Sequence, residues 1–145
     1  MVQKMSEVRR VCAYCEVGTD LTKEHIFPEC LHKRTASGET TSIASTPQGD
    51  KAVSDPTRIR DVCTQCNNEA LSQLDNYICE LHDQYFKKLV HPGDRIDFRF
   101  DFDKLFRWLL KTSYNTSLVR GWHFMKNFAL LQYILGKGPL STSGY

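Results

Sequence analysis

Residues 62–68 read VCTQCNN, and residues 12–15 read CAYC. Each stretch places two cysteines around a two-residue spacer, which lets both thiolates reach the same side of one metal ion. Two such pairs supply the four ligands of tetrahedral zinc, at Zn–S distances of about 2.3 Å. We therefore predict a structural zinc ion, whose binding energy is folding energy, held by Cys12, Cys15, Cys63 and Cys66.

The composition favours metal binding over disulfide bonds. The chain has 145 residues, 41% hydrophobic and 25% charged, as in an ordinary soluble domain. No apolar run reaches the roughly 18 residues that span a bilayer, and residues 1–10 lack the apolar core of a secretory signal. We therefore expect a cytoplasmic protein without membrane contact, in which paired cysteines bind metal. Cys30 and Cys79 are interpreted as small buried hydrophobic residues.

Apolar periodicity predicts several helices. A first helix is expected to begin near Cys66 or Asn67 and to end at His91, before Pro92 and Gly93. Its apolar stripe recurs at steps of three and four: Leu71, Leu74, Ile78, Leu81, Tyr85 and Leu89. A second helix would be capped by Asp103 and turn these residues inward: Leu105, Phe106, Leu109 and Leu110. A third would run from about Trp122 to Leu135 and end at Gly136.

The remaining segments are predicted to be less regular. Residues 35–57 are rich in Ser, Thr, Gly and Pro, which indicates a long loop or a hairpin with an extended tip, in which residues 40–43 could form a strand. Residues 94–101 alternate apolar and charged side chains, as in a short strand or an extended linker.

A candidate catalytic group lies between and just after the two cysteine pairs. Glu24 and His25 stand between them, and Asn67 directly follows the last cysteine. Asn67 lies four residues before Leu71, so it should face inward, toward a hairpin that carries His25. A histidine can take a proton from water near neutral pH, and carboxylate and amide oxygens suit a hard cation such as Mg²⁺. These residues therefore suit metal-assisted hydrolysis of a phosphodiester.

The order CxxC, acidic residue with His, CxxCN resembles the zinc-stapled HNH endonucleases, which have the ββα-metal fold. Residues 62–68, followed by Leu71 and Leu74-Asp75, resemble a bacterial subgroup, and RWLLKT at 107–112 is similar to its C-terminal helix. The resemblance implies an α+β fold. Residues 1–92 would form the ββα-metal core stapled by the four-cysteine zinc site, and residues 93–145 a C-terminal helical extension packed on it.

The resemblance also implies a role for each candidate residue. His25 matches the general base that activates water, and Asn67 matches the third HNH position, which helps to hold a catalytic Mg²⁺ or Mn²⁺. Glu24 matches the acidic metal ligand, which is commonly Asp and one methylene shorter. At the middle position, about five residues before Cys63, Arg58 stands in place of Asn. The implied substrate is DNA, with RNA left open, and the implied products carry 5′-phosphate and 3′-hydroxyl ends.

Two other functions remain open from the sequence. One is a non-catalytic zinc module that binds nucleic acid or protein; the net charge of +2 neither requires nor excludes a nucleic-acid partner. The other is an interaction protein whose C-terminal helices dock a partner. Aromatic residues that could form such a surface, but are expected mostly in the core, are Phe102, Phe106, Trp108, Trp122, Phe124 and Phe128. Oligomeric state and substrate structure are not set by the sequence.

Overall fold

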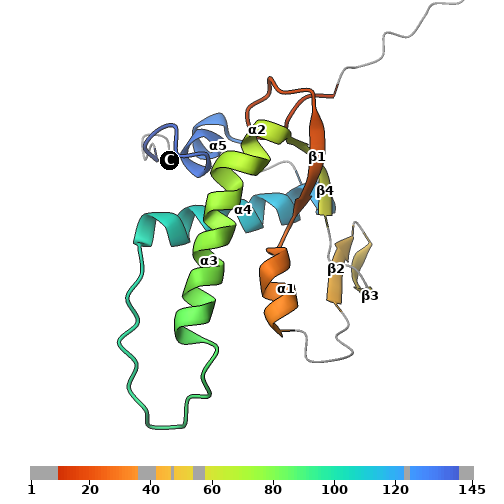
Figure 1. Cartoon of the computed structure of the whole chain (residues 1–145). Coiled ribbons are helices and arrows are strands. Elements are labelled where there is room, and N and C mark those ends of the chain that lie inside the picture. The colour runs from red at the N-terminus through yellow and green to blue at the C-terminus, as the bar shows by residue number, and fades with distance from the viewer. Residues whose placement is uncertain (1–9, 36–41, 47, 54–57, 123–124, 141–145) are drawn as a thin grey trace, which may run out of the picture.

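The computed structural model describes residues 10–35, 42–46, 48–53, 58–122 and 125–140 (Figure 1). It is a mixed α+β structure with two small sheets and several helices. The strands are β1 (Leu21–His25), β2 (Ser42–Thr46), β3 (Gly49–Val53) and β4 (Arg58–Cys63). The helices are α1 (Glu29–Thr35), α2 (Thr64–Cys66), the π-helical turn η1 (Asn67–Leu71), α3 (Ser72–Tyr85), α4 (Phe102–Arg120) and α5 (Phe128–Ile134).

Strands β1 and β4 form the antiparallel ribbon that carries the candidate site. The register pairs Glu24 with Ile59 and His25 with Arg58, and it shifts between Thr22 and Glu24. Because side chains alternate along a strand, Glu24 and Ile59 face the core together, while His25 and Arg58 face outward. Neighbouring residues of β1 therefore reach opposite sides of the ribbon.

Residues 35–57 were predicted to form either a long loop or a hairpin, and the described part of this region contains a hairpin. Strands β2 and β3 pair from Ser42–Val53 to Thr46–Gly49. The predicted strand at residues 40–43 begins outside the described residues, and β2 starts at Ser42.

One helical rod follows the second cysteine pair, close to the predicted start. It runs through α2, η1 and α3, and its buried residues include Leu71, Leu74 and Ile78. The predicted end at His91 is wrong, because α3 stops at Tyr85. Beyond it the next residue of the stripe, Leu89, is 84% exposed, so its burial does not stabilise a further turn of helix.

The C-terminal helices differ from the prediction at their ends. The cap of α4 is Asp101, whose side chain accepts from the Lys104 N–H at 3.1 Å; Asp103, the predicted cap, lies inside the first turn. Gly121, with φ of +70°, ends α4, so the third helix cannot begin at residue 122 and starts after the Asn127 cap. Gly136, also at positive φ, follows α5, as the sequence indicated.

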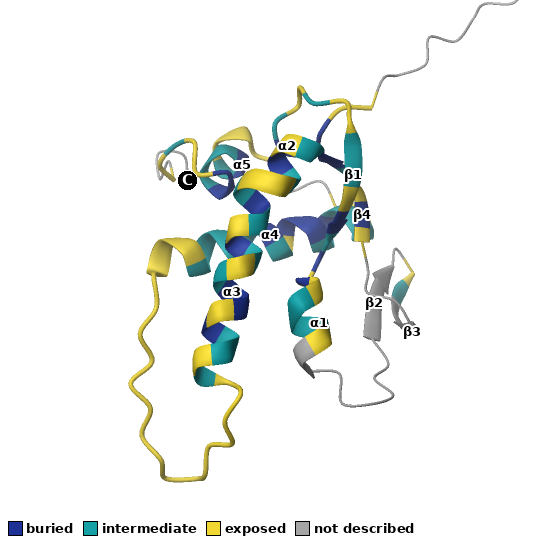
Figure 2. Cartoon of the chain, in the orientation of Figure 1, coloured by how far each residue is buried: buried dark blue, intermediate teal, exposed yellow. Residues whose placement is uncertain are grey.

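A single buried cluster joins the N-terminal half to α4 and α5. Tyr14 packs edge-on against Tyr114 of α4, with ring centroids 5.1 Å apart, and Leu131 and Ile134 of α5 complete the cluster. The predicted inner face of α4 is correct only in part: Leu105, Phe106 and Leu110 are half-buried, and Leu110 packs on the cluster, but Leu109 is 47% exposed. Its buried residues are Lys111, Tyr114, Asn115 and Ser117. Figure 2 shows this dark interior where α4 passes behind α3 and the ribbon.

Cys30 of α1 and Cys79 of α3 are paired as a disulfide, with Cα atoms 6.3 Å apart. The prediction that both are unpaired hydrophobic residues is wrong. The two cysteines are 49 residues apart in the sequence, which does not reveal that α1 lies against α3. Among the described residues, no helix has the length and apolar character required to cross a membrane.

Candidate functional site

The four cysteines of the two CxxC pairs converge on one point. Their sulfur atoms all lie within 4.8 Å of one another, and Cys15 Sγ is 3.8 Å from Cys63 Sγ. Sulfurs at the corners of a tetrahedron around zinc, each about 2.3 Å from the ion, are about 3.8 Å apart. The donor set and spacing therefore fit a structural metal such as zinc, and the predicted ligands are confirmed as one cluster.

Local backbone contacts build this cluster. The first cysteine pair closes a turn in which Glu16 N–H donates to the Cys12 carbonyl at 2.9 Å, and Ala13 N–H ties it to β4 through the Asp61 carbonyl at 2.7 Å. A Cβ at Gly18 would lie 2.6 Å from the Cys63 sulfur, so only glycine fits there. Burial opposes ionisation of Cys15, but N–H donors of Gly18 and Val17 lower its thiol pKa to about 7.

His25 lies at the end of β1, beside the exposed Arg58. The Arg58 Nε donates to His25 Nε2 at 2.9 Å. Burial lowers the pKa of His25 below its ordinary value, and the positive charge of Arg58 lowers it further. At neutral pH the ring is therefore neutral and presents a lone pair, the state required of a general base.

Arg58 is the neighbour of His25 to which the sequence analysis gave no role. It occupies the position where the resemblance expects Asn, and its contact with His25 depends on the cross-strand register. Its position five residues before Cys63 could have indicated that Arg58 lies near the site. That it lies opposite His25, however, follows only from the shifted register of β1 and β4.

Asn67 faces β1, as its helical phase predicted. Its side-chain amide Nδ2 donates to Thr22 Oγ1 at 2.8 Å and to the Lys23 carbonyl at 3.0 Å. It thereby pins the start of the helical rod to the strand that carries His25. The turn that begins with Asn67 is π-helical, a wider geometry that often marks functional positions. Its predicted role as a metal ligand stays a prediction.

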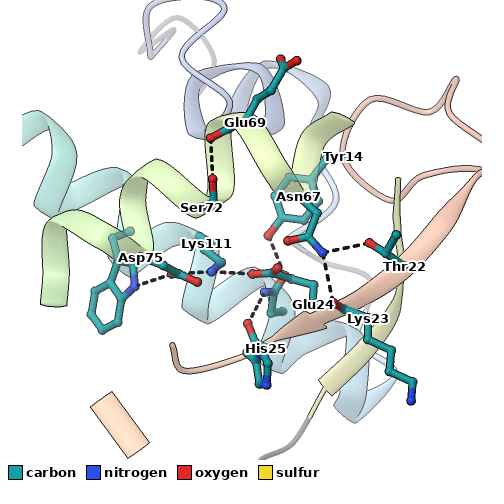
Figure 3. A network of polar contacts seen from close by, with 12 residues as sticks. Tyr14, Thr22, Lys23, Glu24, His25, Asn67, Glu69, Ser72, Asp75 and Lys111 are labelled. Carbon is teal, nitrogen blue, oxygen red and sulfur yellow. Dashed lines mark hydrogen bonds and ion pairs between the residues drawn. The ribbon is translucent and has the colours of Figure 1, made fainter. Parts of the chain in front are cut away.

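Glu24 points away from His25, into a buried polar network (Figure 3). Its Oε1 forms an ion pair 2.5 Å from Lys111 Nζ, and the same ammonium donates to Asp75 Oδ1 at 2.6 Å. Lys111 is fully buried, and Trp108 Nε1 also donates to Asp75, at 3.2 Å. Burial raises the pKa of both carboxyls, and the opposing charge of Lys111 offsets this only in part.

The contacts of Glu24 do not fit its predicted role at a magnesium site. The Glu24 carboxylate is neutralised in the core by Lys111. Asn67 bonds to β1 through its amide nitrogen, whereas a magnesium ion would be bound by the amide oxygen. Among the described residues, the only group of three or more His, Cys, Asp or Glu side chains that could hold a metal ion is the four-cysteine cluster. The structure brings Asn67 to the strand of His25, but it does not bring Glu24 to the same side.

A second buried contact supports the backbone of His25. The Tyr14 hydroxyl donates to Asn115 Oδ1 at 2.6 Å, and Asn115 Nδ2 donates to the His25 carbonyl at 3.4 Å. Asn115 of α4 therefore couples the first cysteine turn to the end of β1.

Replacing Asn115 by alanine should lower the free energy of unfolding by about 1–3 kcal/mol, because the buried Tyr14 hydroxyl loses its acceptor. Urea unfolding measures this. Tyr14→Phe, which removes the hydroxyl and leaves no unpaired donor on that ring, is expected to cost less. An alanine variant as stable as the wild type would contradict the coupling.

No protein-family model, curated protein or solved structure matches this chain.

Proposed function

We propose that this chain is an HNH-type endonuclease that hydrolyses phosphodiester bonds in DNA, with His25 as general base. The observation that carries the proposal is the placement of His25. His25, whose pKa is lowered by burial and by the charge of Arg58, lies at the outward end of a two-stranded ribbon, and the following helix is joined to that ribbon by four cysteines and by Asn67. Strand, strand and helix in this order support a ββα-metal core.

Arg58 supplies a positive charge that can bind the negatively charged phosphate of a phosphodiester. A guanidinium binds phosphate oxygens well, so a bound phosphate would draw Arg58 from His25 Nε2 and expose the lone pair of that nitrogen. His25 would then accept a proton from the attacking water as the new P–O bond forms. The P–O3′ bond breaks in line, and the leaving oxygen takes a proton from solvent.

The surface around His25 suits a nucleic-acid backbone. Lys23 on β1 and Arg58 and Arg60 on β4 are all exposed on the two strands that form the ribbon. Cations that neutralise phosphates supply most of the sequence-independent affinity for DNA. Because Glu24 is paired with Lys111, its carboxylate is not available to a magnesium ion at the surface, and the assay compares cleavage with Mg²⁺, Mn²⁺ and EDTA.

The test is cleavage of supercoiled plasmid under single-turnover conditions, with Mg²⁺, Mn²⁺ or EDTA, and with zinc content measured in each sample. His25→Ala should lower the rate at least about 100-fold, because general-base catalysis contributes factors of this size or more. His91→Ala changes an exposed histidine in the loop after α3 and should cleave like the wild type. Equal rates for His25→Ala and the wild type would exclude His25 as the base.

One observation favours a second candidate, a zinc module that binds nucleic acid without cleaving it. The acidic residue beside His25 is held in a buried ion pair instead of lying at the surface. This candidate predicts salt-sensitive DNA binding that is weakened by loss of Lys23 or Arg60, with no cleavage of duplex, nicked or branched DNA by folded, zinc-loaded protein.

A further inference from the structure

The segment between α3 and α4 projects from the body of the protein. Residues 86–101 leave the end of α3, turn at Pro92-Gly93 and return as an extended chain beside the same helix (Figure 1). The whole projection is exposed, as the continuous yellow trace in Figure 2 shows. Its returning arm, residues 94–101, reads DRIDFRFD.

One edge of this arm is already bonded to α3. The Tyr85 hydroxyl accepts from the Arg99 N–H at 3.0 Å and donates to the Arg99 carbonyl at 3.1 Å. The Tyr77 hydroxyl accepts from the Asp101 N–H at 2.6 Å. In an extended chain alternate residues direct their backbone groups to the same edge, so the groups of residues 97, 99 and 101 face α3.

The opposite edge is that of Ile96, Phe98 and Phe100. Within the described part of the chain, no hydrogen bond is made by their backbone N–H and C=O groups. Their side chains are 49%, 40% and 45% exposed, although Phe98 packs on Tyr85 at 4.7 Å and on Phe100 at 5.1 Å. An open edge with apolar side chains is a template for another strand.

The sequence of the arm indicates which strand could pair with its open edge. If two copies of residues 95–101 pair antiparallel about Phe98, Phe98 lies opposite Phe98 and Ile96 opposite Phe100. The same register places Asp97 opposite Arg99, and Arg95 opposite Asp101. Every apolar residue then meets an apolar residue and every acid meets an arginine, which are the favourable cross-strand pairs.

We propose that two copies of this chain form a dimer by antiparallel pairing of residues 95–101 about a twofold axis at Phe98. The partner is a second copy because the segment is complementary to itself, as an isologous interface requires. Tyr77 and Tyr85 hold the arm extended in each copy, so little ordering is needed on association. The apolar face of the resulting ribbon continues onto the exposed Phe86 and Val90 beside it.

Reversing the charge of Asp97 or of Arg99, which lie opposite each other in the proposed dimer and form its central charged pair, tests both the interface and its register. Asp97→Arg puts arginine opposite arginine at two symmetric places in the dimer, and Arg99→Asp puts aspartate opposite aspartate. Each variant alone should dimerise at least about tenfold more weakly than the wild type, because like charges directly opposite are destabilising. An equimolar mixture of the two should form a heterodimer, since every central pair is then of opposite charge.

Sedimentation equilibrium over a range of concentrations measures each association, with one variant carrying a fluorescent label so that the heterodimer is counted directly. Asp97 and Arg99 also pair within one chain, at 2.8 Å, but an effect confined to one chain would not be reversed by mixing. A full-length wild type that stays monomeric, single variants that associate like the wild type, or a mixture that fails to pair would each overturn the proposal.

Discussion

Cys63→Ser should abolish zinc binding and leave the chain unfolded at 25 °C. Cys63 is 2% exposed and contributes one of four sulfurs that meet where β4, the first cysteine turn and α2 join. A structural zinc site of this kind is worth about 10–16 kcal/mol, which matches or exceeds the whole net stability of most domains. Since Cys12, Cys63 and Cys66 belong to the buried cluster, the loss should spread through the chain.

The measurement is zinc content by atomic emission together with far-UV circular dichroism and dispersion of amide NMR signals. Cys30→Ser is the matched control, because it changes a cysteine outside the four-cysteine cluster and should keep one zinc per chain. A Cys63→Ser protein that lacks zinc but retains the wild-type melting temperature would contradict a structural role for the metal.

Lys111→Met should lower the free energy of unfolding by about 3–5 kcal/mol, the cost of leaving buried charges without their partner. The ammonium of Lys111 is fully buried and contacts both Glu24 and Asp75. Methionine fills a similar volume, so the loss of stability comes from removal of the positive charge and not from a cavity. Urea unfolding measures it, with Lys104→Met on the exposed side of the same helix as a control expected to cost less than about 1 kcal/mol.

The loss of unfolding free energy caused by Lys111→Met, called the deficit below, should depend on pH. Burial raises the pKa of Glu24 and of Asp75, and removal of Lys111 raises both further. A carboxyl with a raised folded-state pKa stabilises the fold below its unfolded pKa, near 4, and this contribution is lost as pH rises through the folded value. The deficit should therefore be smallest at about pH 4 and grow toward pH 7. A deficit independent of pH, or unaffected by adding Glu24→Gln, would exclude the buried carboxylates as its origin.

The four-cysteine cluster and the start of the helical rod were predictable because their determinants are local. A two-residue spacer defines a metal-binding turn, and the stripe from Leu71 through Leu81 defines a helix face without reference to the rest of the chain. The inward phase of Asn67 followed from the same stripe, and its bonds to β1 confirm it.

The surroundings of Glu24 and His25 were not predictable in this way. Hydrophobic periodicity assigns a lysine such as Lys111 to solvent, so a buried ammonium that joins two carboxylates from distant elements leaves no signature in the sequence. The contact of Arg58 with His25 depends on a register shift within the ribbon. The end of α3 depends on what its stripe can pack against, and beyond Tyr85 the next residue of the stripe, Leu89, is 84% exposed.

The four-cysteine zinc site is tested most directly by X-ray absorption at the zinc edge of the purified protein, with metal content determined on the same sample. The four-cysteine staple holds the ribbon of His25 against the helix of Asn67, and every functional proposal depends on that arrangement. We expect one zinc per chain with four sulfur neighbours at about 2.3 Å and no nitrogen or oxygen ligand. Zinc bound by fewer sulfurs, or folded protein with no metal and paired cysteines at these positions, would contradict it.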